Sequence, residues 1–118
     1  MKIQLDSAIH LLHAGSHAVL ATQSTNLPGY PYATAVPLVV DEHHRPLLLI
    51  SALAEHTKNL LADPRSSLSV VEQGPTNVQN AARMTVVGDF ERFDAAPERI
   101  ARYLRYQADA EHHLELDF

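Results

Sequence analysis

Apolar residues recur along the chain either at helical spacing or in the alternation typical of strands. The changes between these two patterns predict the order of the helices and strands. Residues 3–15 carry Ile9 and Leu12 at near-helical spacing, with Gly15 where a helix would end. Segment 17–22, HAVLAT, is short, apolar and made of small or β-branched residues, as in a buried strand. The chain therefore begins with a predicted helix and a strand.

Two further strands are predicted on either side of a charged loop. In 32–40, YATAVPLVV, alternate residues share one face, and a Pro-Gly turn precedes the segment. Pro37 lacks a backbone N–H, so this strand needs a free edge or a bulge there. Segment 41–46, DEHHRP, is turn-like, and the apolar segment 47–51 is predicted to return as the next strand.

The second half of the chain continues with helix, strand, strand and helix. Segment 54–63 predicts a short helix that ends before a proline, and 67–72 and 83–93 alternate like strands. A last helix is predicted to begin at 95–97. Strands at hairpin spacing outnumber helices, so the pattern favours an antiparallel α+β fold over a doubly wound parallel sheet.

Composition narrows the class of protein. The 118 residues, of which 46% are hydrophobic, suit one globular domain spanning 1–118. A net charge of -5 with nine dispersed basic residues argues against nucleic-acid binding. The absence of cysteine excludes disulfides and thiolate chemistry. No stretch is apolar enough for a signal peptide or a membrane span, so a cytoplasmic protein without membrane contact is expected.

The corner between the third predicted strand and the second predicted helix is a candidate anion site. Ser51 and Thr57 offer hydroxyl donors, Lys58 offers a charge, and a helix N-terminus favours anions. In the alternative interpretation, the two hydroxyls cap or solvate the helix and Lys58 is a surface charge. The residues alone favour this alternative, because such corners are usually structural.

The eight histidines form no recognisable metal motif. His10 and His13 are one helical turn apart and could share a face, which is a geometry that can bind metal. Adjacent pairs such as His43 and His44 point apart on regular structure and chelate poorly. Solvated surface histidines are the favoured interpretation, and no metal site is predicted. No serine lies in a G-x-S-x-G context, so no catalytic residue is assigned.

The ordered run GYPYATAVPLVVDEHHRPLLLISALAEHTKNLLADPRSSLSVVE, followed by ARMTVVGDFERF and RYLRYQADAEHHLELDF, resembles a known family. It is similar to the pyridoxamine-phosphate-oxidase-like FMN-binding split barrels, and most similar to their haem-utilisation (HugZ-type) branch. The resemblance begins at about residue 8 and covers nearly the whole chain.

The resemblance implies an antiparallel α+β split barrel with flanking helices that forms a homodimer, with FMN at the subunit interface. The FMN phosphate would be held by Ser51, His56, Thr57 and Lys58, although relatives often carry a basic residue where this chain has His56. The flavin ring would face the strand residues Tyr32, Ala33, Thr34 and Ala35. The implied activity is that of an FMN-dependent oxidoreductase with an unidentified small-molecule substrate.

The same branch implies two alternatives. The protein could bind or handle haem, in which case His112 and His113, near the end of the sequence, are the candidate iron ligands. It could also be a dimeric member without catalysis. Relatives continue past LELDF with one or two further strands, so a barrel that lacks its last strand or strands is expected if the chain ends at Phe118.

Overall fold

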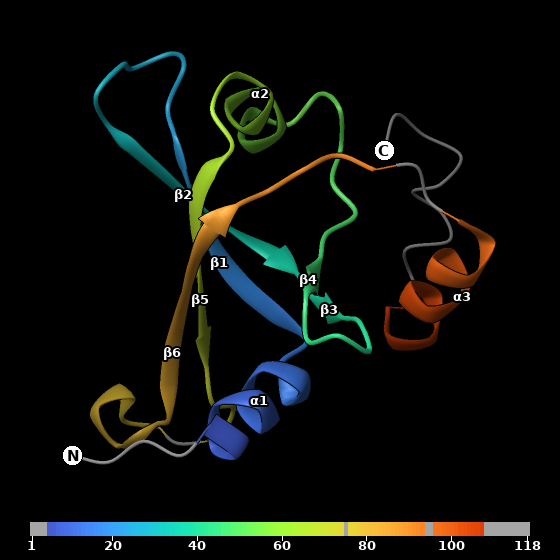
Figure 1. Ribbon diagram of the computed structural model, residues 1–118. Helices are drawn as coiled ribbons and strands as arrows, with labels where there is room; N and C mark the ends of the chain where they lie inside the picture. Colours follow the sequence, from blue (N-terminus) through green and yellow to red (C-terminus); the bar gives the residue numbers. More distant parts are fainter. Residues whose placement is uncertain (1–4, 75, 94–95, 108–118) are drawn as a thin grey trace.

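The computed structural model describes residues 5–74, 76–93 and 96–107 and contains two small antiparallel sheets and three α-helices (Figure 1). The elements follow the chain as α1 (Leu5–Ala14), β1 (His17–Gln23), β2 (Pro31–Pro37), β3 (Val39–Val40), β4 (Pro46–Leu47), α2 (Glu55–Ala62), β5 (Arg65–Val71), the 3₁₀ turn η1 (Val78–Asn80), β6 (Arg83–Asp89) and α3 (Pro97–Tyr106). The predicted antiparallel α+β class is confirmed.

The larger sheet has four strands in the order β2-β1-β5-β6, and every pairing in it is antiparallel. β1 is central and β2 lies at one edge, where the missing N–H of Pro37 interrupts no second ladder. In the described residues the sheet is open and does not close on itself, as expected of a split barrel that lacks strands. Helix α1 lies at one end of this sheet and α2 at the other (Figure 1).

One face of the sheet carries the main hydrophobic core. Leu20, Leu68 and Val70 are at most 1% exposed, and Leu12 of α1 covers them at one end. Met84, Val86 and Phe90 also pack against this core, as the alternation in 83–93 predicted. The core therefore uses one face of each strand and leaves the other face open.

Two predicted strands differ from the observed ones. The predicted strand 32–40 is divided at Leu38, whose N–H donates to Ser16 O at 3.0 Å and turns the chain away from the sheet. The predicted strand 47–51 keeps only Leu47 in a ladder, because its partner β3 has just two residues. The apolar run beyond Leu47 instead reflects burial, since Leu48 packs against the main core and Leu49 against a second cluster.

The second cluster joins the short ladder to the last helix. Val39 and Leu47 pack there against Tyr103 of α3, which lies on the far side of the ladder from the large sheet (Figure 1). Arg102 donates from Nε and Nη2 to Val40 O, at 3.1 and 2.9 Å, and fixes the helix on the ladder. None of the helices in the described ranges is long and apolar enough to cross a membrane.

Candidate functional site

The predicted anion corner lies where the chain enters α2, and its hydroxyls are used locally. Ser51 Oγ accepts from Leu53 N at 3.2 Å, and Thr57 Oγ1 donates to Ser51 O. The Thr57 hydroxyl hydrogen is thus directed at the backbone and not at solvent. The Ser51 hydroxyl can still donate outward, because it acts as an acceptor in its own contact.

The two basic candidates of the corner differ in charge and exposure. His56 is half-buried and its Nε2 has no hydrogen-bond partner within the described structure. Burial lowers the pKa of His56, so its imidazole is neutral at pH 7 and can only offer a hydrogen bond to an anion. Lys58 is exposed and supplies the positive charge of this corner. Glu55 accepts from Asn26 Nδ2 at 2.6 Å, which turns its carboxylate toward the β1–β2 loop.

The four predicted flavin-facing residues of β2 divide between the two faces of the sheet. Tyr32 and Thr34 pair with Thr22 and Leu20 on the core side, whereas Ala33 and Ala35 lie on the open face. A single flat ring cannot contact all four side chains from one side of the strand.

A buried asparagine, which the sequence did not single out, connects the corner to the sheet. Asn59 of α2 is 0% exposed. Its Oδ1 accepts from Thr25 N and Thr25 Oγ1 at 3.0 and 3.1 Å, and its Nδ2 donates to Thr22 Oγ1 at 3.0 Å. These contacts hold α2 against β1 and the loop that follows it. Asn59 thus positions the corner without facing solvent.

An apolar groove of about 400 Å³ lies between α2 and the chain segments that flank it. Its walls come from β4 and the stretch after it, from α2 and from the residues that follow β6. The lining residues are Pro46, Leu47, Leu48, Leu49, Ile50, Ala52, Thr57, Leu60, Leu61, Phe90, Glu91, Arg92 and Phe93. Thr57 belongs both to this groove and to the corner at the start of α2, so the two sites adjoin.

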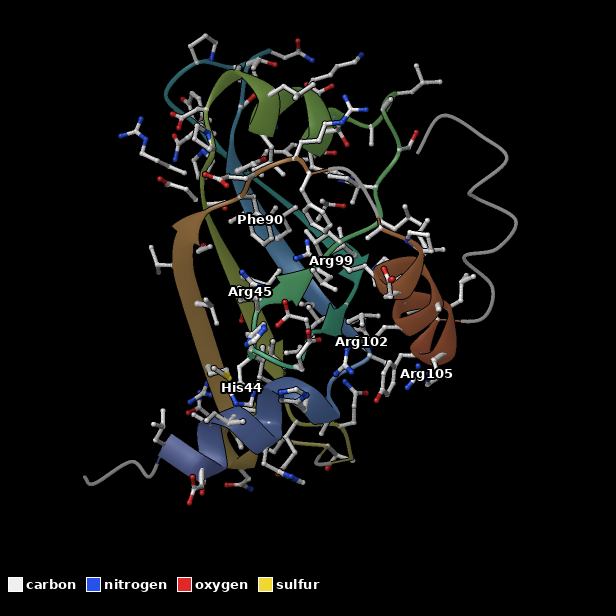
Figure 2. The ribbon with its side chains drawn as sticks, turned by 45° about the vertical axis from the view of Figure 1, so that its right-hand side comes forward. His44, Arg45, Phe90, Arg99, Arg102 and Arg105 are labelled. Atoms are coloured by element: carbon white, nitrogen blue, oxygen red, sulfur yellow. The ribbon has the colours of Figure 1, made fainter. Side chains whose placement is uncertain are left out.

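Arginines lie beside the groove. Arg92 lines it directly, and the guanidinium of Arg99 stacks 4.5 Å from the ring centre of Phe93. Figure 2 shows Arg99, Arg102 and Arg105 along α3, with Phe90 above Arg99. The groove thus has mostly apolar walls, and the charged residues that line it are Arg92 and the acidic Glu91, with Arg99 reaching it only through Phe93. Apolar walls with cationic side chains nearby suit a flat apolar ligand that carries anionic groups.

Comparison with known proteins identifies the class of fold. The family model described as pyridoxamine 5'-phosphate oxidase matches residues 7–116, so the chain belongs to this family. The predicted family is therefore confirmed, and the relatives below agree with the predicted haem-utilisation branch.

Three relatives are particularly similar. The chain is 35% identical over 79 residues to the chloroplastic non-canonical heme oxygenase HOZ of Arabidopsis thaliana, a match that covers 67% of this chain and 24% of that protein. A heme-binding protein from Mycobacterium smegmatis has a TM-score of 0.78 at 28% identity, covering 100% of this chain and 48% of that one. A protein of unknown function from Agrobacterium tumefaciens has a TM-score of 0.83 at 28% identity, covering 98% and 52%. The chain thus spans about half or less of each of them.

The predicted haem ligands, His112 and His113, lie outside the described residues. The groove and Asn59 were missed because their members come from separate elements. One local signal did exist for the groove: the run LLLI at 47–50 is more apolar than a strand with one solvent face requires.

Proposed function

We propose that this chain binds haem in the apolar groove beside α2. The observation that carries the proposal is the groove itself, with leucine and phenylalanine walls and arginines at its margin. A porphyrin has two apolar faces and two carboxylates at one edge, which such a surface complements. The names of two relatives at 28% identity or more, a heme oxygenase and a heme-binding protein, support the same ligand.

In this proposal the groove would hold the porphyrin ring, and the sequence supplies candidates for the iron ligand. The resemblance to the haem-utilisation branch makes His112 and His113 the candidates for the axial imidazole. Bound haem would supply the iron chemistry. The residues of this chain would hold the ring, exclude water from its faces and pair with its carboxylates through Arg92 and Arg99.

A haem titration followed at the Soret band tests the groove with a matched pair of variants. Leu61 lines the groove and is 67% exposed, whereas Leu53 is 72% exposed and lies outside it. We expect Leu61→Glu to weaken haem binding at least about tenfold, because a carboxylate repels the porphyrin acids and wets the apolar wall. Leu53→Glu should bind as the wild type does. Equal binding by both variants would place haem elsewhere.

The iron ligands need their own variants. His112→Ala combined with His113→Ala should change the Soret position and weaken binding, whereas His10→Ala should change neither. An unaltered spectrum in the double variant would exclude the two candidates as ligands.

A second candidate ligand is FMN, supported by the family and by the corner at the start of α2. Its phosphate would meet Lys58, the Ser51 hydroxyl and the first-turn N–H groups of α2, with neutral His56 as a further donor. The flavin ring would carry the redox chemistry of an FMN-dependent oxidoreductase. Lys58→Ala or Ser51→Ala should weaken FMN uptake by about 1.5–3 kcal/mol, measured by flavin fluorescence. A preparation that takes up no FMN would contradict this candidate.

We further propose that two copies of the chain associate through the open face of the large sheet. The centre of this face carries small uncharged side chains: Val19, Ala21, Ala33, Ala35, Ser67, Ser69, Thr85 and Val87. Val19 is 44% and Val87 79% exposed, so a flat uncharged surface is open to a partner. This dimer would bring Ala33 and Ala35 to the subunit interface, where the family resemblance expects FMN.

Sedimentation velocity tests the dimer. Val87→Glu places a charge on the open face, on the edge strand β6, and should yield monomers, whereas Val78→Glu, at a 51% exposed residue of η1, should leave the dimer intact. A monomeric wild-type protein would overturn the proposal. A folded dimer that takes up neither haem nor FMN would instead favour a member of the family without catalysis.

A further inference from the structure

Two histidines meet between α1 and the loop that joins β3 to β4, outside the lining of the groove and away from the α2 corner. Nε2 of His13 lies 2.8 Å from Nδ1 of His44, with ring centres 5.1 Å apart and ring planes at 85°. The residues are 31 positions apart in the sequence, and both are exposed. Figure 2 shows His44 beside α1, at the end of the β3–β4 ladder.

The backbone holds His44 in place independently of its side chain. Its φ of 64° is the only positive value at a non-glycine residue in the described ranges. The loop is fixed by Asp41, which is 3% exposed: its backbone O accepts from His44 N at 3.0 Å, and its Oδ1 accepts from His43 N and Arg45 N at 2.9 Å. Left-handed conformations at such residues persist where the surroundings determine them and are frequent at functional sites.

The charge on Asp41 is maintained by these contacts. Burial alone would raise the pKa of Asp41, but the N–H groups of Arg45 and His43 and the Arg45 side chain outweigh it and lower the pKa. The carboxylate is therefore ionised at neutral pH and keeps the loop closed. His44 is thus presented to α1 in a preset orientation.

The distance between the two imidazoles suits a shared ion as well as a shared proton. A hydrogen bond between neutral rings places one proton between two nitrogen lone pairs. Zinc–imidazole bonds are about 2.0–2.1 Å long, so two nitrogens on one tetrahedral ion lie roughly 3.3 Å apart. The rings would need to separate by only roughly half an ångström to replace the proton with a metal.

We propose that His13 and His44 form a two-imidazole site for a divalent cation of the imidazole-preferring class, such as Zn²⁺. Water would complete the coordination, because no group of three or more His, Cys, Asp or Glu side chains gathers in the described residues. The charge of Asp41 favours an ion there and that of Arg102 opposes it, so an exchangeable ion is expected, not a permanent structural one.

The test is a Zn²⁺ titration of tag-free protein by calorimetry, with ¹⁵N spectra of the imidazoles. We expect one ion per chain and shifts at His13 and His44. His13→Ala and His44→Asn should each weaken binding at least about tenfold. Asparagine tolerates the left-handed backbone at position 44, so that variant keeps the loop. His13→Gln replaces His13→Ala if the alanine variant does not fold.

Matched controls lie on the same two elements. His10 is an exposed neighbour on α1 and His43 an exposed neighbour in the loop, so His10→Ala and His43→Ala should bind Zn²⁺ as the wild type does. Affinity should also fall in acid, because protons compete with the metal for the same nitrogen lone pairs. Binding that survives both His13→Ala and His44→Asn, or no binding by the wild type, would overturn the proposal.

Discussion

The two apolar clusters of this molecule differ in how completely they are covered. The main core lies between the large sheet and α1, and its residues Leu20 and Val70 are 0% exposed. The second cluster is smaller, centred on Val39, Leu47 and Tyr103, and the groove opens beside it. Leu47 and Leu49 of the second cluster line the groove, and so do Leu48, Leu60 and Phe90, which pack against the outside of the main core.

This difference in coverage assigns different roles to the two clusters, with the main core contributing to the stability of the fold and the open surface contributing to ligand binding. A closed core contributes to folding because its apolar surface has already left the water. An apolar surface that stays open contributes less to folding and more to association with a ligand. We therefore expect substitutions in the main core to act on the fold and substitutions around the second cluster to act on ligand uptake.

The largest expected effect is a loss of stability from Leu20→Ala. This change creates a cavity in the closed core and should lower the free energy of unfolding by about 2–5 kcal/mol. Leu49→Ala, in the half-buried wall of the groove, should lower it by less. Urea unfolding measures both. A larger loss from Leu49→Ala would mean that the second cluster, and not the first, dominates the fold.

The second largest loss of stability is expected from Asn59→Ala, although alanine is the better helix former. The change leaves Thr25 N–H and the Thr22 hydroxyl without their buried partner, which should cost about 1–3 kcal/mol of unfolding free energy. Asn80→Ala, at an exposed residue of η1, is the control and should leave stability nearly unchanged. Equal thermal midpoints for the two variants would show that the polar link between α2 and β1 adds nothing.

A smaller effect is expected at Tyr103, where the second cluster has a polar contact. Burial raises the pKa of Tyr103, and the N–H of Leu49 hydrogen-bonds to its phenol oxygen. Tyr103→Phe keeps the ring and removes this acceptor, so it should cost about 0.5–1.5 kcal/mol. Tyr106→Phe, on the same helix at a 58% exposed residue, should have no measurable effect. Comparable losses would show that the contact to Leu49 is not what distinguishes Tyr103.

The smallest expected effect is a dependence of stability on pH through His56. Its pKa is lowered from 6.5 by burial, so the unfolded chain binds this proton more readily than the folded chain. Stability from this group is therefore fully present above about pH 6.5 and declines as the pH falls below it. His56→Gln should flatten the melting temperature between about pH 5 and 6.5 relative to wild type. A slope unchanged by His56→Gln would assign the effect to other groups.

Local sequence signals predicted most of the helices and strands. Alternation in 83–93 and helical spacing in 3–15 depend on neighbours in the sequence, and the structure confirms both elements, with β6 ending at Asp89. The strand expected over 47–51 was wrong because an apolar run reports burial on both sides without specifying a pairing partner. The division at Leu38 depends on Ser16, which lies in another part of the chain.

The candidate site was less accessible to sequence reasoning. Ser51 and Thr57 are in contact at the start of α2, and Lys58 follows them in the first turn of that helix, but their role in binding a phosphate stays a prediction. The contacts of Asn59 with Thr22 span 37 positions, and those of His13 with His44 span 31. No local pattern encodes such meetings, and only the folded chain brings these side chains together.

The strand order of the large sheet also determines the order in which parts of the chain can fold. β1 and β2 form one hairpin, and β5 and β6 form another across the loop 72–82. Among the strands of the described residues, the ladder between β1 and β5, with Leu20 opposite Leu68, joins the two hairpins. Closing the long chain segment between the two hairpins costs more conformational entropy than closing the loop within either hairpin. We therefore expect each hairpin to form early and the pairing of β1 with β5 to form later. The folding rate of this domain therefore depends on how soon the first hairpin meets the second.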